Sequence, residues 1–284
     1  MARKYGWKKD KSDARDHVLK LCRKPVQLPS CVDLRKEITL PEIYDQGDLG
    51  SCTANAIGFA YQYDEISQKN SNCFMPSRLY IYYNEREIEH TVLEDSGAEL
   101  RDGMKSINRD GVCQEPSWPY VINRFTQKPT KECYDEGKKC KSVSYSHVEQ
   151  DIISLKTVLN HKLPIIFGFI VYESFESEIV AKTGIMPMPK TQNEPCLGGH
   201  AVVCVGYDDD KIMGDGNKGA MIIRNSWGHG WGDQGYFYMP YDFITNPQFA
   251  SDFWVLNQVT NPRFPLRSEY LTYQRPLPSQ PQPQ

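Results

Sequence analysis

The sequence predicts an α+β fold in two lobes, with helices early in the chain and strands later. Apolar residues recur at helical spacing from residue 52 onward, again in residues 77–85, and again in residues 100–107. Later apolar runs are short and bounded by turn residues, as is typical of strands. The expected strands are residues 165–171, 200–207, 220–225, 235–239 and 253–257. Because the helices precede the strands, we expect a helical N-terminal lobe and a C-terminal lobe built from a β-sheet or barrel.

Helix-ending and polar residues delimit these elements. Gly111 is expected to end the helix over residues 100–107, and Pro164 ends a shorter helix over residues 150–161. Residues 121–150 are polar and lack periodicity, so we expect a loop-rich crossing between the lobes.

Composition argues against several classes of function. The chain has 284 residues and a formal net charge of −3 with no basic block, so nucleic acid is not an expected partner. The longest apolar run, residues 163–172, is too short to cross a bilayer, so no membrane span is expected. The N-terminus lacks the hydrophobic stretch of a signal peptide. An intracellular, virion or host-cell compartment is therefore favoured over classical secretion, and we expect a monomer.

The strongest chemical signal is a cysteine between a glycine-containing loop and a helix. Gly47 and Gly50 permit a tight loop, and apolar residues at helical spacing follow Cys52. Unpaired N–H groups at a helix N-terminus favour an anion, so we expect the Cys52 thiol to ionise more readily than an ordinary cysteine. Gln46, six residues earlier, can fold back across the loop and donate its side-chain amide to a developing oxyanion.

A histidine and an asparagine complete the candidate catalytic set. His200 follows a glycine pair that leaves its ring accessible, and it opens an apolar strand. Asn225 ends the next strand and can accept a hydrogen bond from the imidazole, which would fix the tautomer of the ring. Trp227 is placed to shield that hydrogen bond from water. The sequence therefore predicts nucleophilic catalysis by Cys52 with His200 as its base.

These three segments, in this order, resemble the papain family of cysteine peptidases. The matching sequences are Gln-Gly-x-x-Gly-Ser-Cys at residues 46–52, His-Ala-Val at residues 200–202 and Asn-Ser-Trp-Gly-x-x-Trp-Gly at residues 225–232. By the order of such landmarks the resemblance covers residues 28–258. It implies a papain-like two-lobed fold, with the active site in the cleft between the lobes.

The resemblance also implies peptide-bond hydrolysis through a thioester. Cys52 would attack the carbonyl, and His200, oriented by Asn225, would act first as base and then as acid. The amide of Gln46 and the backbone N–H of Cys52 would hold the oxyanion. No metal and no cofactor are expected.

The substrate-binding residues follow from the same resemblance. The backbone at Gly97 and Ala98 is expected to pair with the substrate residue before the scissile bond, as an added strand would. Ala201 and Trp227 are expected to line the substrate site. The expected partners are protein or peptide substrates.

Three positions depart from the animal and plant members of the family. Leu49 stands where those members carry a half-cystine, and Thr53 where they carry a tryptophan. Gly199 replaces the aspartate that commonly precedes the histidine. These features resemble the prokaryotic and viral branch instead. They put the family disulfide in doubt but leave the catalytic chemistry unchanged.

Nine cysteines leave at least one thiol unpaired unless it pairs between chains. Without a signal peptide, a mostly reduced set is expected. Cys113, Cys133 and Cys140 lack the closely spaced pairs of a structural zinc site. Unpaired thiols or one disulfide are therefore favoured over a metal at these positions.

The chain is expected to divide into three segments. Residues 1–27 form a short leader with Trp7 as its one large apolar anchor, and residues 28–259 form the peptidase domain. Residues 260–284 are rich in Pro and Gln and are expected to be an extended tail. The leader is either an inhibitory segment, which would make the protein a zymogen, or a tail packed on the surface. Two other functions stay open: an inactive binding protein with this fold, and an acyl-transferase that passes the same thioester to an amine.

Overall fold

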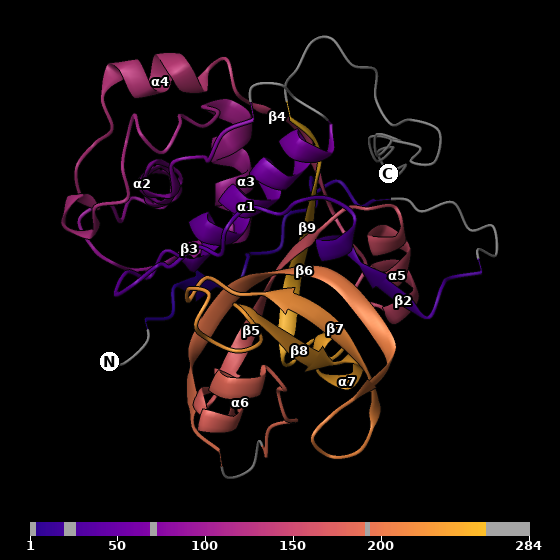
Figure 1. The fold of residues 1–284 in the computed structure, drawn as a ribbon. Helices are drawn as coiled ribbons and strands as arrows, with labels where there is room; N and C mark the ends of the chain where they lie inside the picture. The colour runs from indigo at the N-terminus through magenta and orange to yellow at the C-terminus, as the bar shows by residue number, and fades with distance from the viewer. Residues whose placement is uncertain (1–3, 20–26, 69–72, 191–193, 260–284) are drawn as a thin grey trace, which may run out of the picture.

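The computed structural model describes residues 4–19, 27–68, 73–190 and 194–259. A helical part and a β-rich part pack side by side (Figure 1). The predicted tail over residues 260–284, and residues 1–3 and 20–26 of the leader, lie outside the described residues. The two-lobed α+β architecture predicted from the sequence is confirmed.

The helical part contains four α-helices. They are α1 (Cys52–Ser67), α2 (Arg78–Ile88), α3 (Leu100–Arg109) and α4 (Lys131–Gly137). The Ser77 side chain caps α2 by accepting a hydrogen bond from the N–H of Tyr80. Gly111, with a φ of 73°, follows α3 in the left-handed conformation that glycine adopts without strain. The helices predicted near residues 52, 77–85 and 100–107 are confirmed.

The β-rich part is an antiparallel sheet with the strand order β4-β9-β5-β6-β7-β8, and β2 (Cys31–Asp33) also pairs with β6. The other strands are β4 (Ser142–His147), β5 (Ile165–Tyr172), β6 (Cys196–Ile212), β7 (Lys218–Arg224), β8 (Tyr236–Pro240) and β9 (Ala250–Val259). The helices α5 (Ile152–Asn160), α6 (Glu178–Thr183) and α7 (Tyr241–Ile244) belong to this part. All five predicted strands are present. Strand β6 is longer than expected because its polar end continues to pair with β7, as far as Ile212 opposite Lys218.

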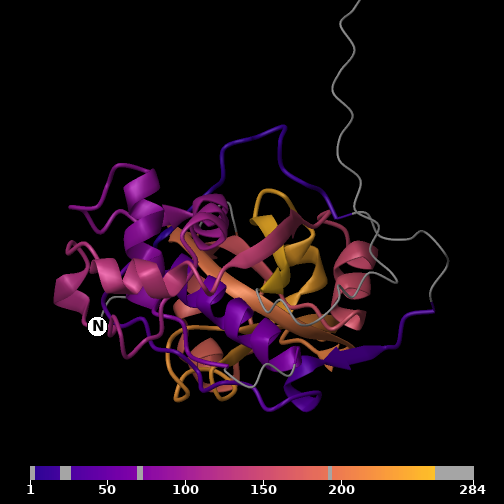
Figure 2. The same ribbon diagram turned by 90° about the horizontal axis from the view of Figure 1, so that it is seen from above.

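Helix α1 joins the two parts. It contacts α2 and α3 on one side and β5, β6 and β9 on the other, and most of its side chains are buried. Seen from above, it runs beside the long strand β6 (Figure 2). The first residue of α1 therefore lies at the boundary between the helical and the β-rich part.

The expected loop-rich crossing over residues 121–150 is only partly right. It contains α4 and the strand β4, which pairs antiparallel with β9. The residues of β4 (Ser-Val-Ser-Tyr-Ser-His) show no apolar run, and β4 is held as an edge strand by its backbone bonds to β9. Pairing with a distant strand is a tertiary effect that local patterns do not reveal.

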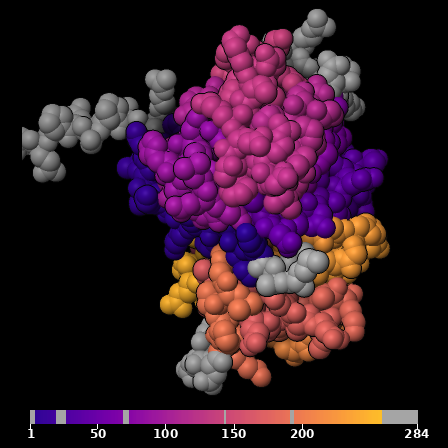
Figure 3. Space-filling view, turned by 90° about the vertical axis from the view of Figure 1, so that its left-hand side faces the viewer, coloured from indigo at the N-terminus to yellow at the C-terminus, as the bar shows by residue number. Residues whose placement is uncertain are grey.

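The leader enters the fold as a strand. Strand β1 (Trp7–Lys8) pairs in parallel with β3 (Ala98–Glu99), and Trp7 is buried. In the space-filling view the indigo N-terminal segment lies between the magenta helical part and the orange strands (Figure 3). The described leader residues therefore contact both parts of the molecule, β3 in the helical part and Asp252 of β9 in the β-rich part.

No helix in the described part of the chain is long and apolar enough to cross a membrane. The eight cysteines that the structure describes carry free thiols, and Cys22 lies outside these residues.

Candidate active site

Cys52 is the first residue of α1, at the end of the loop that begins at Gln46. Gly47 in this loop has a φ of 57°, which allows the chain to turn back toward the helix start. The backbone N–H of Ala201, from β6 in the other lobe, points at the Cys52 sulfur and lowers its pKa. Cys52 and the neighbour of His200 therefore meet across the boundary between the lobes.

His200 and Asn225 form a direct hydrogen bond. The His200 Nε2 and the Asn225 Oδ1 are 2.8 Å apart, and both side chains are buried. The N–H of Ser226 also donates to Asn225 Oδ1, at 2.8 Å, which identifies that atom as the oxygen. Because an oxygen accepts, His200 Nε2 must carry the hydrogen, and Nδ1 is the ring nitrogen left for proton exchange.

Aromatic rings cover this pair. Trp227 stacks on the His200 ring with centroids 5.0 Å apart and an angle of 26°. Phe169 of β5 meets the same ring edge-on, with centroids 5.7 Å apart. The leader adds Tyr5, whose ring meets His200 at 6.0 Å. The histidine–asparagine bond is thus held in an apolar shell that excludes water.

Gln46 lies beside the same site and is 1% exposed. Its Oε1 accepts a hydrogen bond from the Ser226 hydroxyl at 2.7 Å, which fixes the orientation of the amide. Its Nε2 then donates to the carbonyl of Leu49 at 3.0 Å and to the carbonyl of Lys4 at 3.2 Å. The amide predicted to bind an oxyanion is therefore in contact with a peptide carbonyl of the leader.

The predicted substrate-binding backbone also contacts the leader. The N–H of Ala98 donates to the carbonyl of Gly6 at 2.7 Å. A side chain at Gly97 would collide with that carbonyl, because its Cβ would lie 2.1 Å from the oxygen. Residues of the leader thus lie at three of the positions expected for substrate, Gly97, Ala98 and Trp227. At the fourth, Ala201, the backbone N–H points at the Cys52 sulfur.

Cys52 differs from the expectation of a readily ionised thiol. Burial raises the pKa of Cys52 to about 11, and the backbone N–H groups of Ala201 and Gly6 offset this only in part. The Cys52 side chain is 0% exposed, with Ala201 of β6 and Gly6 of the leader both against its sulfur. In this closed arrangement Cys52 is a neutral thiol at physiological pH.

Sequence reasoning missed several residues around the site. Ser226 orients both Gln46 and Asn225, and Asp252 accepts a hydrogen bond from the Trp7 ring. Gly168 makes room for that ring, because a Cβ there would lie 1.9 Å from it. A single glycine inside an apolar strand often indicates such a close approach. Gly168 was therefore the signal in the sequence for this position.

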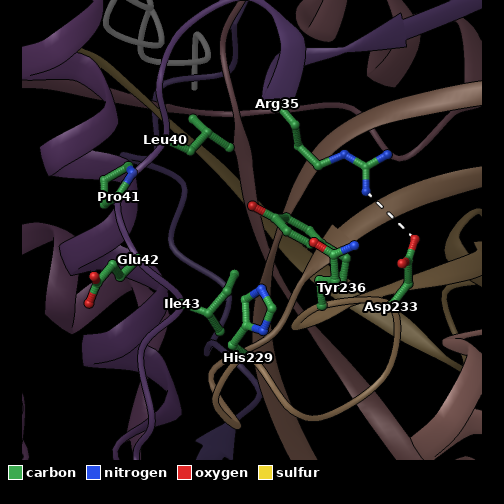
Figure 4. A pocket seen from close by; sticks show the side chains of 9 residues that line it. Arg35, Leu40, Pro41, Glu42, Ile43, His229, Asp233 and Tyr236 are labelled. Carbon is green, nitrogen blue, oxygen red and sulfur yellow. Dashed lines mark ion pairs between the residues drawn. The ribbon is translucent and has the colours of Figure 1, made fainter.

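Another cavity lies apart from these residues. It has a volume of about 390 Å³ and is formed by residues 40–43 and the turn that carries His229 (Figure 4). Two of the residues that line it form an ion pair, with 4.0 Å between Arg35 Nη1 and Asp233 Oδ2. None of the predicted catalytic residues lines it, so His229 belongs to a different region from His200.

The fold and this site define a class of protein, a cysteine peptidase of the papain family. The model of the papain family of cysteine proteases matches residues 28–252, and the chain belongs to this family.

Two relatives show which members it is similar to. An uncharacterised peptidase C1-like protein of Acanthamoeba polyphaga mimivirus is 44% identical over 285 residues, covering 92% of this chain and 89% of the relative. The crystal structure of xylellain, a cysteine protease from Xylella fastidiosa, has a TM-score of 0.82 at 42% identity and covers 92% of this chain and 99% of xylellain. Digestive procathepsin L 3 of Tenebrio molitor, at 18% identity and a TM-score of 0.65, shares the fold.

Proposed function

We propose that this peptidase hydrolyses peptide bonds through a thioester on Cys52, with His200 as proton carrier and Asn225 as its orienting group. One observation carries this proposal. The amide of Gln46 holds a peptide carbonyl, that of Lys4, and the leader N–H two residues later points at the Cys52 sulfur. A peptide backbone can therefore lie across all the groups that the reaction needs.

In the acylation step the Cys52 sulfur forms a bond to the substrate carbonyl carbon. The thiol proton passes to His200 Nδ1, and the carbonyl oxygen becomes an oxyanion held by the Gln46 Nε2 and the Cys52 N–H. When the oxyanion collapses, the C–N bond breaks and the proton moves from His200 to the leaving amine. Asn225 keeps the ring in position throughout, because its Oδ1 accepts from Nε2.

In the deacylation step water replaces the amine. His200 takes a proton from the water, the hydroxide oxygen bonds to the thioester carbon, and the C–S bond breaks. The released Cys52 sulfur recovers a proton from His200. The sum is one peptide bond and one water consumed, with one acid and one amine formed.

The test is covalent labelling of the Trp7→Ala protein, in which the leader is expected to leave the cleft, with an epoxide-type inhibitor of thiol peptidases, followed by mass-spectrometric mapping of the modified residue. We expect one label, on Cys52, and loss of peptidase activity in proportion to labelling. The exposed Cys196 is the internal control, since an unselective thiol reagent would modify it first. Labelling of Cys196 with activity lost and Cys52 unmodified would contradict the proposal.

We further propose that the protein is made as a zymogen in which the leader blocks the cleft. The observations in support are the buried Cys52, the pairing of β1 with β3, and Tyr5 against the His200 ring. The direction of the leader also favours inhibition. In a substrate with its scissile carbonyl on Gln46, the preceding residue would pair at Ala98, whereas in the leader Gly6 pairs there and Lys4 lies on Gln46. The leader therefore crosses the site in the opposite sense and is not presented for cleavage.

Replacing the buried anchor of the leader should release it. Trp7 is 7% exposed, and removing a buried tryptophan costs about 3–5 kcal/mol of packing. We expect Trp7→Ala to raise the initial peptidase rate of the full-length protein by about tenfold or more, since most of the packing of the Trp7 side chain holds the leader in the cleft. The matched control is Lys9→Ala, an exposed residue two positions further on, which should leave the rate unchanged.

A chain starting at Leu28 provides a second comparison. It should be as active as Trp7→Ala, provided that its melting temperature shows that it is folded. Equal rates for wild type, Trp7→Ala and the shortened chain would mean that the leader is a surface tail and not an inhibitor.

A further inference from the structure

The leader is joined to the C-terminal lobe by two carboxyl groups from opposite ends of the chain. Asp252 of β9 accepts two hydrogen bonds at Oδ2, from the Trp7 ring N–H at 3.1 Å and from the backbone N–H of Asp10 at 2.8 Å. Asp10 in turn accepts from the N–H of Arg101 at 3.0 Å and from the Trp254 ring N–H at 2.9 Å. The hydrogen bond from the backbone N–H of Asp10 to Asp252 therefore places the two carboxyl groups beside each other.

Negative charge exceeds positive charge around this pair. Among the residues that the structure describes, the guanidinium that acts on Asp10 is that of Arg101 on α3, and it is shared with Asp16, which accepts from its Nε at 3.0 Å. Lys9 is exposed and acts on Asp252 only weakly through solvent. With every carboxyl ionised, three carboxylates face one guanidinium at the point where the leader is attached. A proton bound to the pair removes part of this repulsion.

We propose that the Asp10–Asp252 pair is a proton-dependent latch, which holds the leader in the cleft while one carboxyl is protonated and weakens as the pH rises. This inference rests on the proposed zymogen, because it states what regulates release of the same segment. The ligand that controls this latch is the proton.

The sign follows from the docked and released states. Burial and the charge of Asp252 raise the pKa of docked Asp10 to about 7, and burial also raises the pKa of Asp252. In the released leader Asp10 is in water, where an aspartate has a pKa of about 4. A group with the higher pKa in the docked state favours docking at low pH, and this contribution is lost as the pH rises through about 7. The docking constant should fall about tenfold between pH 6 and pH 8.

His147 of β4 acts in the opposite direction. It packs edge-on against Trp254 at 5.3 Å, close to Asp16 and Asp252, and burial lowers its pKa. Its protonation in acid therefore opposes docking. The wild type and Asp10→Asn carry the same His147. The difference between their responses to pH therefore isolates the contribution of Asp10.

The experiment measures docking without turnover. Full-length Cys52→Ala protein is compared at pH 6 and pH 8 by hydrogen exchange of the amides in residues 4–19 and of the Ala98 N–H, corrected for the intrinsic effect of pH on exchange. The protection of these amides from exchange that is due to docking should be about tenfold lower at pH 8 than at pH 6. Adding Asp10→Asn, which keeps the backbone N–H to Asp252 and removes the titrating group, should leave the leader docked at pH 8 with this change lost.

Asp13→Asn is the matched control, because Asp13 is a half-buried leader carboxylate whose pKa is held below the usual range by its bond to Arg15. It should keep the wild-type response. An equal response of wild type and Asp10→Asn to pH would overturn the latch, as would loss of the response in Asp13→Asn.

If Asp10→Asn does not dock at either pH, Asp252→Asn decides the matter. It removes the charge that raises the pKa of Asp10, so the loss of docking should shift to lower pH, and an unshifted response would overturn the proposal. A leader that docks with the expected pH dependence while Trp7→Ala leaves activity unchanged would retain the latch and reject the zymogen.

Discussion

Cys52→Ala is expected to abolish peptidase activity and to leave the protein folded. In enzymes of this kind, removing the nucleophile lowers kcat by on the order of 10⁴-fold or more, because binding and oxyanion groups alone give little turnover. The side chain is small and lies at the start of α1, so the free energy of unfolding should change by only about 1 kcal/mol. Activity is measured in the Trp7→Ala background as well as in the natural chain, so that a docked leader does not hide the effect.

Cys196→Ala is the matched control for this prediction. Cys196 begins the same strand that carries His200, and its thiol is exposed. We expect full activity in Cys196→Ala and the same melting temperature in both variants. Turnover by Cys52→Ala at a rate near that of Cys196→Ala would show that another group attacks the substrate.

Residues close together in sequence carried most of what was predictable about the site. The loop at Gln46, the helix from Cys52 and the strand from His200 each have a local pattern, and the structure brings all three together. The side-chain partner of Asn225 also follows from residue type, because an amide oxygen at the end of a strand needs a donor.

The route of the leader was predictable only in outline. Trp7 gave its position as an anchor, but the slot that receives it is made by Gly168 on β5 and Gly199 on β6, which are far apart in sequence from each other and from Trp7. Local patterns carry no information about which glycine faces which ring. The same reason explains why the roles of Asp252 and Ser226 were missed.

One departure from the family has a structural reason. Thr53, which replaces a tryptophan, donates its hydroxyl to Glu85 Oε2 at 2.8 Å, and both side chains are fully buried. Burial raises the pKa of Glu85 well above its usual value, which favours the neutral acid beneath the start of α1. A neutral acid there avoids placing a second negative charge near a Cys52 thiolate.

The site also explains why the closed structure and an active enzyme differ in the state of Cys52. Burial is the largest cause of the raised pKa of the thiol, and the leader, whose Gly6 N–H points at the sulfur, is one of the segments packed there. In the proposed mechanism, release of the leader would admit water and leave the helix N-terminus and His200 as neighbours, both of which favour a thiolate. If the proposed zymogen is correct, blocking the cleft and silencing the nucleophile are two effects of one contact.

Gln46→Ala should lower kcat by about 10²–10³-fold, as the loss of one oxyanion donor does in comparable sites. The Gln46 Nε2 already donates to the Lys4 carbonyl, which occupies the place we assign to a substrate oxygen. Because the charge on that oxygen develops in the transition state, kcat and kcat/KM should fall together with little change in KM.

The control for Gln46→Ala is Ser226→Ala, measured in the same Trp7→Ala background. Ser226→Ala removes the hydroxyl that orients the amide but keeps the Nε2 donor, so its loss of kcat should be much smaller. If the two variants lose activity equally, the role of Gln46 is to hold the loop before Cys52, since the hydrogen bonds from Ser226 reach its Oε1 and its backbone N–H and leave Nε2 untouched. A rise in KM with an unchanged kcat in Gln46→Ala would place this amide in substrate binding and reject it as an oxyanion donor.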